Sequence, residues 1–342
     1  MSNNISSKKR VEYFDIFRGI GIVFMLMGHV DFGMKFNIYI HAFHMPIFFF
    51  VSGYFYNPDK FKSAKEYIIH ELKALIVPYT VFVLLCQPLH YLYTHEFDFK
   101  YFILSYFSSN HNRIDVAGAY WFLLCLFSAK IIFYFIDKYT DGILEAVLIL
   151  LLTLAGNIMT IHLPLCIDSA LSCLLIIYVG YILKKNKDNE IVKKIFAIPW
   201  WILIILFVVN MIGIFYNGYV TVRTNRYEII PLYWINCFTA ILIYINLSKI
   251  LENIKFKPVQ IVCGWLKYFG KNSIVYLVLN ELVIFAVSIV LNSVVKMAGI
   301  GMENAFVSYS AKVLILIATM IVLALFTELF NRTKLKVLLG RF

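Results

Sequence analysis

Hydrophobic residues run through this chain in long unbroken blocks that short polar connections separate. The blocks lack the alternation of a strand, and each is long enough to cross a bilayer as a helix, which takes about 20 residues. Inside a bilayer every backbone polar group needs an internal partner, so helices or a closed barrel are the available structures. The unbroken pattern favours helices. Ten segments can be drawn: 13–31, 38–56, 68–93, 119–137, 143–161, 168–184, 198–216, 228–250, 272–295 and 308–330.

The distribution of basic residues predicts how these segments are oriented. With the N-terminus inside, the inner connections carry 21 of the 31 Lys and Arg residues and the outer connections carry 7. Cytoplasmic loops of membrane proteins are enriched in Lys and Arg. We therefore predict an all-α polytopic membrane protein with about ten transmembrane helices, both termini cytoplasmic, and a single domain over residues 1–342. A cleavage site of the A-x-A type is missing, so we expect a retained first span rather than a signal peptide.

Composition excludes several classes of protein. Hydrophobic residues make up 61% of the chain and charged residues 15%, against about 45–50% and about 25% in soluble domains. An ordinary cytosolic enzyme, a disordered chain and a disulfide-stapled secreted domain do not fit. The inner loops account for the net charge of +11, so we expect no nucleic-acid partner. The six cysteines form no C-x-x-C pair and are interpreted as packing residues.

Three polar side chains interrupt the first segment. Asp15, Arg18 and His29 fall within a sector of about 60° when the helix is wound at 100° per residue. Ionisable groups are costly inside a bilayer and usually face the bundle interior, so this stripe is a candidate site. The alternative is a structural Asp15–Arg18 ion pair at the interface, with His29 as a capping residue of the helix.

The second segment carries two histidines on one face. His41 and His44 are three residues apart and therefore neighbours on a helix. In antiparallel first and second segments, His44 and His29 lie at comparable depths, which favours proton-transfer chemistry. Pro46 is expected to loosen the helix, which membrane bundles tolerate beside a cavity. The small residues at 52–53 are expected to let another helix approach closely.

Basic residues are expected at the cytoplasmic mouth. Lys73 opens the third segment on the same side of the membrane as Arg18. Two cations there suit a ligand that carries phosphate groups. The alternative is a pair of anchors whose side chains extend to the interface.

Other polar and aromatic positions receive structural interpretations. Trp121 is expected in an outer aromatic belt, and Asp168 is interpreted as a helix N-cap in preference to a site acid. Glu281 lies deep in the ninth segment and needs a partner. A metal site would need a third ligand beside the histidines, and the sequence supplies no such cluster, so we expect no metal.

The order and spacing of these residues resemble the acyltransferase family 3 membrane enzymes, particularly the fucose 4-O-acetylase-like branch. Residues 15–19 resemble the family's opening D-x-x-R-G, and His29 resembles its first-span histidine. Residues 44–53 are similar to its signature H-M-P-x-F-F-x-x-S-G. Weaker resemblances lie at Lys73 with Pro78-Tyr79, at 121–123 (W-F-L), at Asp168 with Tyr178 and Gly180, and at 270–277 (G-x-x-S-x-x-Y-L). Where the family often has a histidine after the last motif, this chain has Asn280.

The resemblance implies an O-acyltransferase that moves an acyl group, most often acetyl, from cytoplasmic acyl-CoA to a hydroxyl of a cell-surface or lipid-linked glycan. It implies a multi-pass protein of the bacterial cytoplasmic membrane. The catalytic residues are then expected to be His29, His44 and Asp15. His29 would be the general base or carry the acyl group transiently, and His44 would orient or share its proton. Asp15 would hold Arg18.

The donor-binding residues are then expected to be Arg18, Lys73 and Ser52. Arg18 and Lys73 would receive the phosphates of acetyl-CoA, the donor co-substrate. Ser52 would donate a hydrogen bond to the developing oxyanion.

Three other functions stay open. A glycan transporter or flippase would often show two similar halves, and no such internal symmetry is evident. A glycan polymerase or ligase would depend on a large outer loop rich in Arg and Asp or His, and loop 94–118 is modest in this respect. A structural or sensor protein gives no reason for an aligned polar stripe. The lipid bilayer is an expected partner, and the sequence leaves homo-oligomers open.

Overall fold

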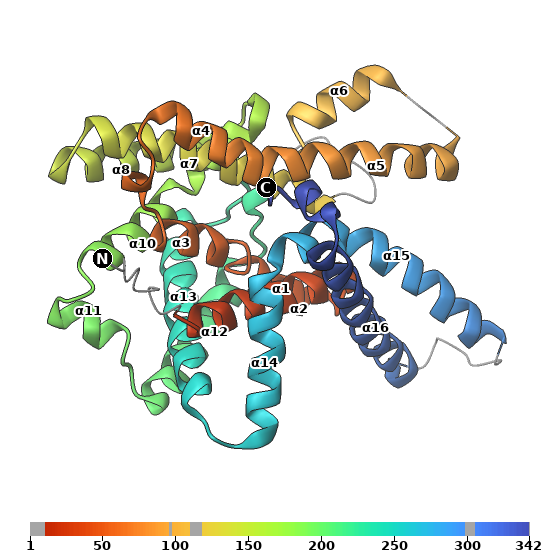
Figure 1. Ribbon diagram of the computed structural model, residues 1–342. Helices are drawn as coiled ribbons and strands as arrows, with labels where there is room; N and C mark the ends of the chain where they lie inside the picture. The colour runs from red at the N-terminus through yellow and green to blue at the C-terminus, as the bar shows by residue number, and fades with distance from the viewer. Residues whose placement is uncertain (1–10, 96–97, 110–117, 298–304, 342) are drawn as a thin grey trace, which may run out of the picture.

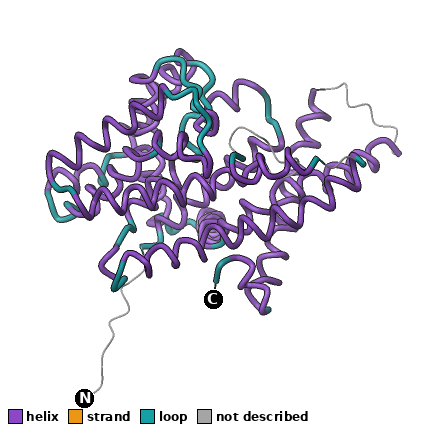
Figure 2. Tube along the Cα trace, turned by 90° about the horizontal axis from the view of Figure 1, so that it is seen from above, coloured by secondary structure: helices purple, strands orange, loops and turns teal. Residues whose placement is uncertain are grey.

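The computed structural model describes residues 11–95, 98–109, 118–297 and 305–341. Within these ranges the secondary structure is helical, apart from turns and an isolated bridge between Thr221 and Arg226 (Figure 2). The all-α prediction is therefore confirmed. The basic N-terminal residues 8–10 and part of the predicted outer loop, residues 110–117, lie outside the described ranges.

The helices follow the order of the predicted segments, and short helices fill several connections (Figure 1). They are α1 (Tyr13–Val30), α2 (Met34–His41), α3 (Pro46–Tyr54), α4 (Ala64–Glu71), the π-helical turn η2 (Leu72–Ile76), α5 (Val77–Thr94), α6 (Phe99–Phe107), α7 (Trp121–Tyr139), α8 (Gly142–Ile158), α9 (Ile167–Ser172), α10 (Leu174–Lys185), α11 (Glu190–Ile195), α12 (Trp200–Asn217), α13 (Ile230–Asn253), α14 (Lys257–Lys271), α15 (Ser273–Met297) and α16 (Ala305–Arg332). The 3-10 turns that matter below are η3 (Gly118–Tyr120), η5 (Val222–Thr224) and η6 (Lys334–Leu339).

Six helical stretches of the described residues are long and apolar enough to cross a membrane, and a bent pair raises the number to seven. The remaining predicted segments are broken, carry several charges, as α7 does, or are short, as the 17-residue α8 is. The protein is therefore a polytopic membrane protein, and the ten crossings and cytoplasmic termini stay predictions. The six stretches are Tyr13–Val30, Ala64–Cys86, Trp200–Asn217, Ile230–Asn253, Ser273–Met297 and Ala305–Arg332, and the bent pair is Pro164–Ser172 with Leu174–Lys185 at 58°.

Predicted segment 38–56 is not one helix. It forms α2 and α3, which residues 42–45 separate as a tight turn. Pro46 is the first residue of α3, where a missing N–H costs no helical hydrogen bond. The proline therefore starts a new helix rather than only loosening a continuous one, and His44 lies in the turn.

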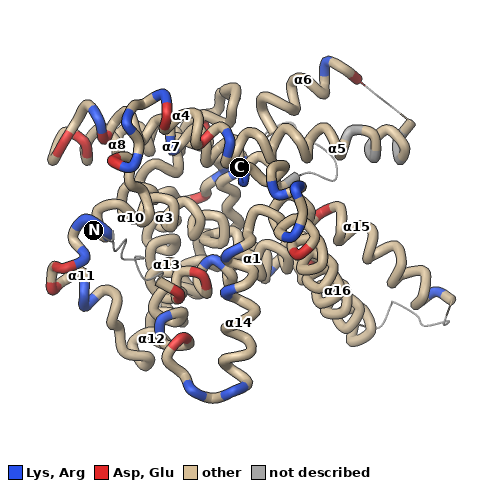
Figure 3. The backbone as a smooth tube through the Cα atoms, in the orientation of Figure 1, with Lys and Arg blue, Asp and Glu red and all other residues tan. Residues whose placement is uncertain are grey.

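The surface of the helices matches a lipid environment. Charged residues gather at helix ends and connections, and long stretches of the tubes between them carry none (Figure 3). On α12, for example, Ile204, Ile205, Val208 and Val209 are each at least half exposed. A contiguous exposed apolar face is unfavourable in water and favourable against lipid tails.

Glycines let two helix pairs approach to backbone contact. A Cβ atom placed at Gly53 of α3 would collide with the carbonyl group of Ile177 in α10, and one at Gly180 would collide with that of Phe50. The crossing of α1 and α14 is built in the same way at Gly19 and Gly270. In a membrane the hydrophobic effect does not drive helices together, and small residues at such crossings allow the close packing that does. The predicted approach of another helix at residues 52–53 is confirmed.

Helix α14 falls in a region that the hydrophobic pattern leaves as a connection. Its Trp265 is half exposed, while Cys263 and Phe269 are buried against the bundle. Lys267 forms an ion pair with Glu12 at the start of α1, and the hydrogen bond and charge of Lys267 lower the pKa of the Glu12 carboxyl. An amphipathic helix of this kind is too polar for a hydropathy criterion and is stabilised by its packing on α1.

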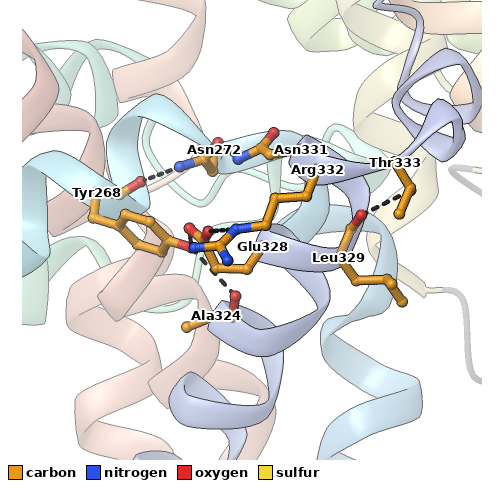
Figure 4. Close-up of polar contacts among 8 residues, drawn as sticks. All are labelled: Tyr268, Asn272, Ala324, Glu328, Leu329, Asn331, Arg332 and Thr333. Atoms are coloured by element: carbon orange, nitrogen blue, oxygen red, sulfur yellow. Dashed lines mark hydrogen bonds and ion pairs between the residues drawn. The ribbon is translucent and has the colours of Figure 1, made fainter.

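A polar cluster joins α14 to α16 near the C-terminus (Figure 4). The Tyr268 hydroxyl donates to a Glu328 carboxylate oxygen at 2.9 Å, and Arg332 Nε donates to the other at 3.1 Å. Asn331 Nδ2 donates to Asn272 Oδ1 at 3.3 Å at the junction of α14 and α15. Three helices are thus tied together at the end that the charge pattern places inside.

Charges within the helical bundle have partners. Lys130 of α7 lies 2.5 Å from the Glu71 carboxylate, which is buried at the end of α4. A buried charge is tolerable when it is paired, and removal of one partner is costly. This pair explains why Lys130 can occupy the middle of α7, where its neighbours along the helix are apolar.

Candidate active site

A cavity of about 260 Å³ lies where α1, the α2–α3 turn, α7 and α15 meet. It is smaller than the roughly 300–1,000 Å³ of pockets for drug-sized ligands, so it suits a single sugar unit. All three histidines of the first two predicted segments line it. The residues that matter below are His29, His41, His44, Trp121, Arg223 and Glu281.

His29 is paired with a carboxylate in this cavity. Its Nδ1 lies 3.2 Å from Glu281 Oε1, and the Glu281 side chain is only 10% exposed. A carboxylate accepts hydrogen bonds, so Nδ1 is assigned as the donor and Nε2 carries the lone pair of the neutral ring. A carboxylate in this position orients an imidazole and stabilises the imidazolium that forms when the ring takes a proton.

His41 and His44 have the same tautomer as His29. His44 Nδ1 donates to the Ile40 carbonyl at 2.7 Å, and His41 Nδ1 donates to the Asn37 carbonyl at 2.8 Å. Their ring centroids are 5.0 Å apart. The predicted neighbourhood of the two rings is confirmed, and each neutral ring has its lone pair on Nε2. His44 is buried, so its position is determined by packing as well as by the hydrogen bond.

The polar stripe of α1 leads away from the cavity. The helix runs unbroken from Tyr13 to Val30, so the alignment predicted for Asp15, Arg18 and His29 applies. Arg18 Nη2 donates to Asp15 Oδ1 at 2.5 Å, and the Asp15 side chain is fully buried while that of Arg18 is 26% exposed. Eleven residues at 1.5 Å each separate Arg18 from His29, which is about 16 Å along the axis. Asp15 therefore lies with Arg18 and not with the histidines.

Lys73 is held by a different set of helices from Arg18. It is exposed in the π-helical turn η2, which packs on α4, α5 and α7. Gly340 packs directly against this turn, since a Cβ atom at Gly340 would collide with the Lys73 carbonyl. Helix α1 has other main neighbours, namely α14, α13 and α15. A π-turn is an uncommon distortion that often marks a functional position.

Ser52 of α3 and Asn280 of α15 are not among the residues that line the cavity. Ser52 is partly exposed in the last turn of α3. Asn280 immediately precedes Glu281, is buried, and its Nδ2 donates to the Leu277 carbonyl at 2.6 Å. A histidine at position 280 would point elsewhere than Glu281, because consecutive residues of a helix are about 100° apart.

Two sequence interpretations are wrong. Trp121, expected in an outer aromatic belt, is 6% exposed and lines the cavity. Asp168 is not the N-cap of α9: that position belongs to Cys166, and Asp168 is buried in the first turn. A carboxylate in the first turn still complements the helix dipole.

Several cavity residues were not identified from the sequence as site residues. The sequence indicates that Glu281 needs a partner, but nothing in the pattern points to His29. Tyr219 and Arg223 come from the connection between α12 and α13, where no periodicity applies. In the part of the chain that the structure describes, no group of three or more His, Cys, Asp or Glu side chains is arranged to hold a metal ion.

Comparison with known protein families matches residues 11–337 to a family described as an acyltransferase domain. No curated protein and no solved structure matches the chain. The matched region includes every helix of the bundle and every cavity residue named above. It also includes the stripe of α1 and the two glycine crossings. The chain therefore belongs to the acyltransferase family 3 of membrane proteins.

Proposed function

We propose that this protein moves an acyl group, with acetyl as the first candidate, from cytoplasmic acyl-CoA to a hydroxyl of a cell-surface or lipid-linked glycan. The cavity's pairing of His29 with Glu281 is the observation that carries the proposal. A neutral imidazole with a carboxylate on Nδ1 is equipped to take a proton through Nε2 and to be stabilised while it holds that proton. The finer assignment to the fucose 4-O-acetylase-like branch and to the bacterial cytoplasmic membrane belongs to this proposal.

The chemical step needs one proton to be moved twice. His29 Nε2 takes the proton of the acceptor hydroxyl while the hydroxyl oxygen forms a bond with the thioester carbonyl carbon. The carbon–sulfur bond then breaks, and the leaving CoA sulfur takes the proton back from the imidazolium. If His29 instead attacks the thioester first, the acyl group resides on Nε2 before the hydroxyl accepts it. His44 is the neighbouring acceptor that shares or orients the proton.

The two substrates are proposed to enter from opposite ends. Arg18, held by Asp15, and Lys73 provide cations for the phosphates of the donor at the end that the charge pattern places inside. The stripe from Arg18 to His29 covers about 16 Å, a length that an extended pantetheine arm can span in part. Apart from Met25 within α1 and Glu281 within α15, the cavity is lined by helix ends and a loop that the charge pattern predicts to lie outside, where we propose that the acceptor glycan binds.

Labelled transfer tests the proposal directly. Membranes that contain the protein are given acetyl-CoA with a radioactive acetyl group, and the surface glycan is analysed by mass spectrometry with and without the protein. We expect label in the glycan and a mass increment of one acetyl group per modified sugar. A glycan that moves across the membrane unmodified would contradict the proposal and favour the transporter, and a longer unmodified glycan would favour the polymerase.

Glu281→Gln is expected to lower kcat by about 10²- to 10⁴-fold, because the amide keeps the size of the side chain but cannot stabilise the imidazolium by charge. The KM for acetyl-CoA should stay unchanged, since the donor's phosphates bind at the other end of α1. Glu281→Asp keeps the charge and should recover part of the rate. Steady-state kinetics in nanodiscs measures both parameters.

The control is Glu190→Gln, which makes the same chemical change on exposed α11, where Glu190 pairs with Lys193. The kcat and KM of that variant should equal those of the parent. A Glu281→Gln enzyme with kcat within threefold of the parent would remove Glu281 from the mechanism.

A further inference from the structure

One wall of the cavity is a short hairpin that connects α12 and α13. Thr221 and Arg226 exchange two backbone hydrogen bonds of 3.0 Å, and Asn225 takes the left-handed conformation that the turn between them requires. Val220 and Val222 are buried and anchor the hairpin in the core. The hairpin is therefore a folded part of the bundle and not a loose connection.

Arg223 is positioned by both its backbone and its side chain. Its carbonyl accepts a hydrogen bond from Ser169 Oγ at 2.8 Å, and its Nη2 donates to the Ser109 carbonyl at 3.2 Å. Ser169 of α9 thus holds the backbone of Arg223, and the carbonyl of Ser109, which follows α6, orients its guanidinium. Arg223 lines the same cavity as the His29–Glu281 pair, so a permanent positive charge borders the place where the acceptor hydroxyl must lie.

Tyr219 places an aromatic surface next to this charge. Its ring lies 5.0 Å from the His41 ring. Burial raises the pKa of the Tyr219 hydroxyl, while the charges of Arg226 and Arg223 act in the opposite direction. Both guanidinium groups are therefore close enough to Tyr219 for their charges to act on its hydroxyl. Arg226, however, is exposed, and its Nη2 lies 3.7 Å from Glu228 Oε1.

We propose that the sugar unit acylated by this protein carries an anionic group, a carboxylate or a phosphate, and that Arg223 binds that group and selects the acceptor. This inference rests on the proposed function. Sugar rings bind to aromatic faces such as those of Trp121 and Tyr219 without regard to charge. A guanidinium adds planar, two-pronged recognition of carboxylate and phosphate oxygens, which a neutral sugar cannot use. The cavity is built to hold one sugar, so the anion lies on that unit or at its linkage to the next.

The test compares three acceptors that share one ring: methyl β-D-glucopyranoside, methyl β-D-glucuronide and methyl β-D-glucopyranoside 6-phosphate. The full chain in nanodiscs is tested for binding of each glycoside by thermal shift without donor. Acetyl transfer to each is then measured with labelled acetyl-CoA. We expect a charged glycoside to bind about ten- to a hundredfold more tightly than the neutral one. The glucuronide and phosphate arms decide which anion is preferred.

Arg223→Gln should remove the preference for the charged glycoside and leave binding of the neutral one unchanged. Arg226→Gln is the matched control: it removes a positive charge from the same hairpin, outside the cavity lining, and should keep the preference. Arg223→Lys keeps the charge and loses the two-pronged geometry, so it should retain part of the preference. If Arg223→Gln fails to fold, the reduced preference of Arg223→Lys for the charged glycoside tests the role of Arg223 instead.

The inference is overturned if the parent protein binds neutral and charged glycosides equally, or if Arg223→Gln keeps the preference. Transfer to neutral and charged glycosides at equal rates overturns it while the acyltransferase function stands. Conversely, charge-selective binding that depends on Arg223, with no acetyl transfer to these glycosides or to the cell's own glycan, overturns the proposed function alone.

Discussion

His29→Gln is expected to abolish acyl transfer and leave the protein folded in the membrane. Glutamine is close to histidine in size and can keep a hydrogen bond to Glu281, but its amide cannot take a proton near neutral pH. A general base contributes about 10²- to 10⁴-fold to a rate, and a residue that carries the acyl group contributes all of it. Transfer of labelled acetyl groups in membranes, normalised to the amount of protein, measures the loss.

His162→Gln is the matched control for this prediction, because His162 is an exposed histidine outside the cavity lining. It should transfer at the parent rate. The two roles proposed for His29 differ in one observable: an acyl carrier retains label on the protein when acceptor is withheld, whereas a general base does not. Undiminished transfer by His29→Gln would leave the cavity without its base and would end the mechanism proposed above.

Gly53→Val is expected to prevent the protein from reaching its folded state. Even the Cβ of alanine would collide with backbone atoms of Ile177, which cannot rotate away as a side chain can. We expect Gly53→Ala to cost about 1–3 kcal/mol of stability, the range for overpacking, and valine to cost more. Because α3 begins directly after the turn that holds His44, a shifted α3 should also lower activity in the alanine variant.

Gly264→Ala supplies the comparison, since no atom lies within 4 Å of a Cβ at that helical position. Alanine there should be neutral or stabilise by about 0.5–1 kcal/mol, because glycine loses more conformational freedom on helix formation. Thermal unfolding in detergent, followed by tryptophan fluorescence, measures both variants. Equal unfolding temperatures for Gly53→Ala and the parent would show that α3 and α10 can separate without cost.

What could be predicted from the sequence is what helix geometry determines. The spacing of Asp15, Arg18 and His29 places them on one face of any continuous helix, and α1 is continuous. The neighbourhood of His41 and His44 and the close approach at residues 52–53 depend on local spacing and side-chain size. These features need no knowledge of which helix packs on which.

What could not be predicted depends on packing between distant segments. His29 and Glu281 are 252 positions apart, and only the placement of α15 beside α1 brings them together. Aromatic belts occur at helix ends, so the position of Trp121 in the sequence favours the membrane interface, and only the packing of α7 shows that it lines the cavity. Arg223 lies in a hairpin whose shape comes from the Thr221–Arg226 bridge, and no hydrophobic period marks it. Pro46 marks in the sequence where the helix is disturbed, but the sequence does not show that residues 42–45 form a turn that separates two helices.

The hairpin between α12 and α13 has a consequence for how such a protein diverges. It is one contiguous stretch of chain, whereas His29 and Glu281 come from helices far apart in the sequence. Loops on a rigid scaffold accept substitution and exchange more readily than packed helices do. Under the role proposed for Arg223, a few changes within residues 218–229, with the buried Val220 and Val222 kept, would alter the choice of acceptor and leave His29 and Glu281 in place.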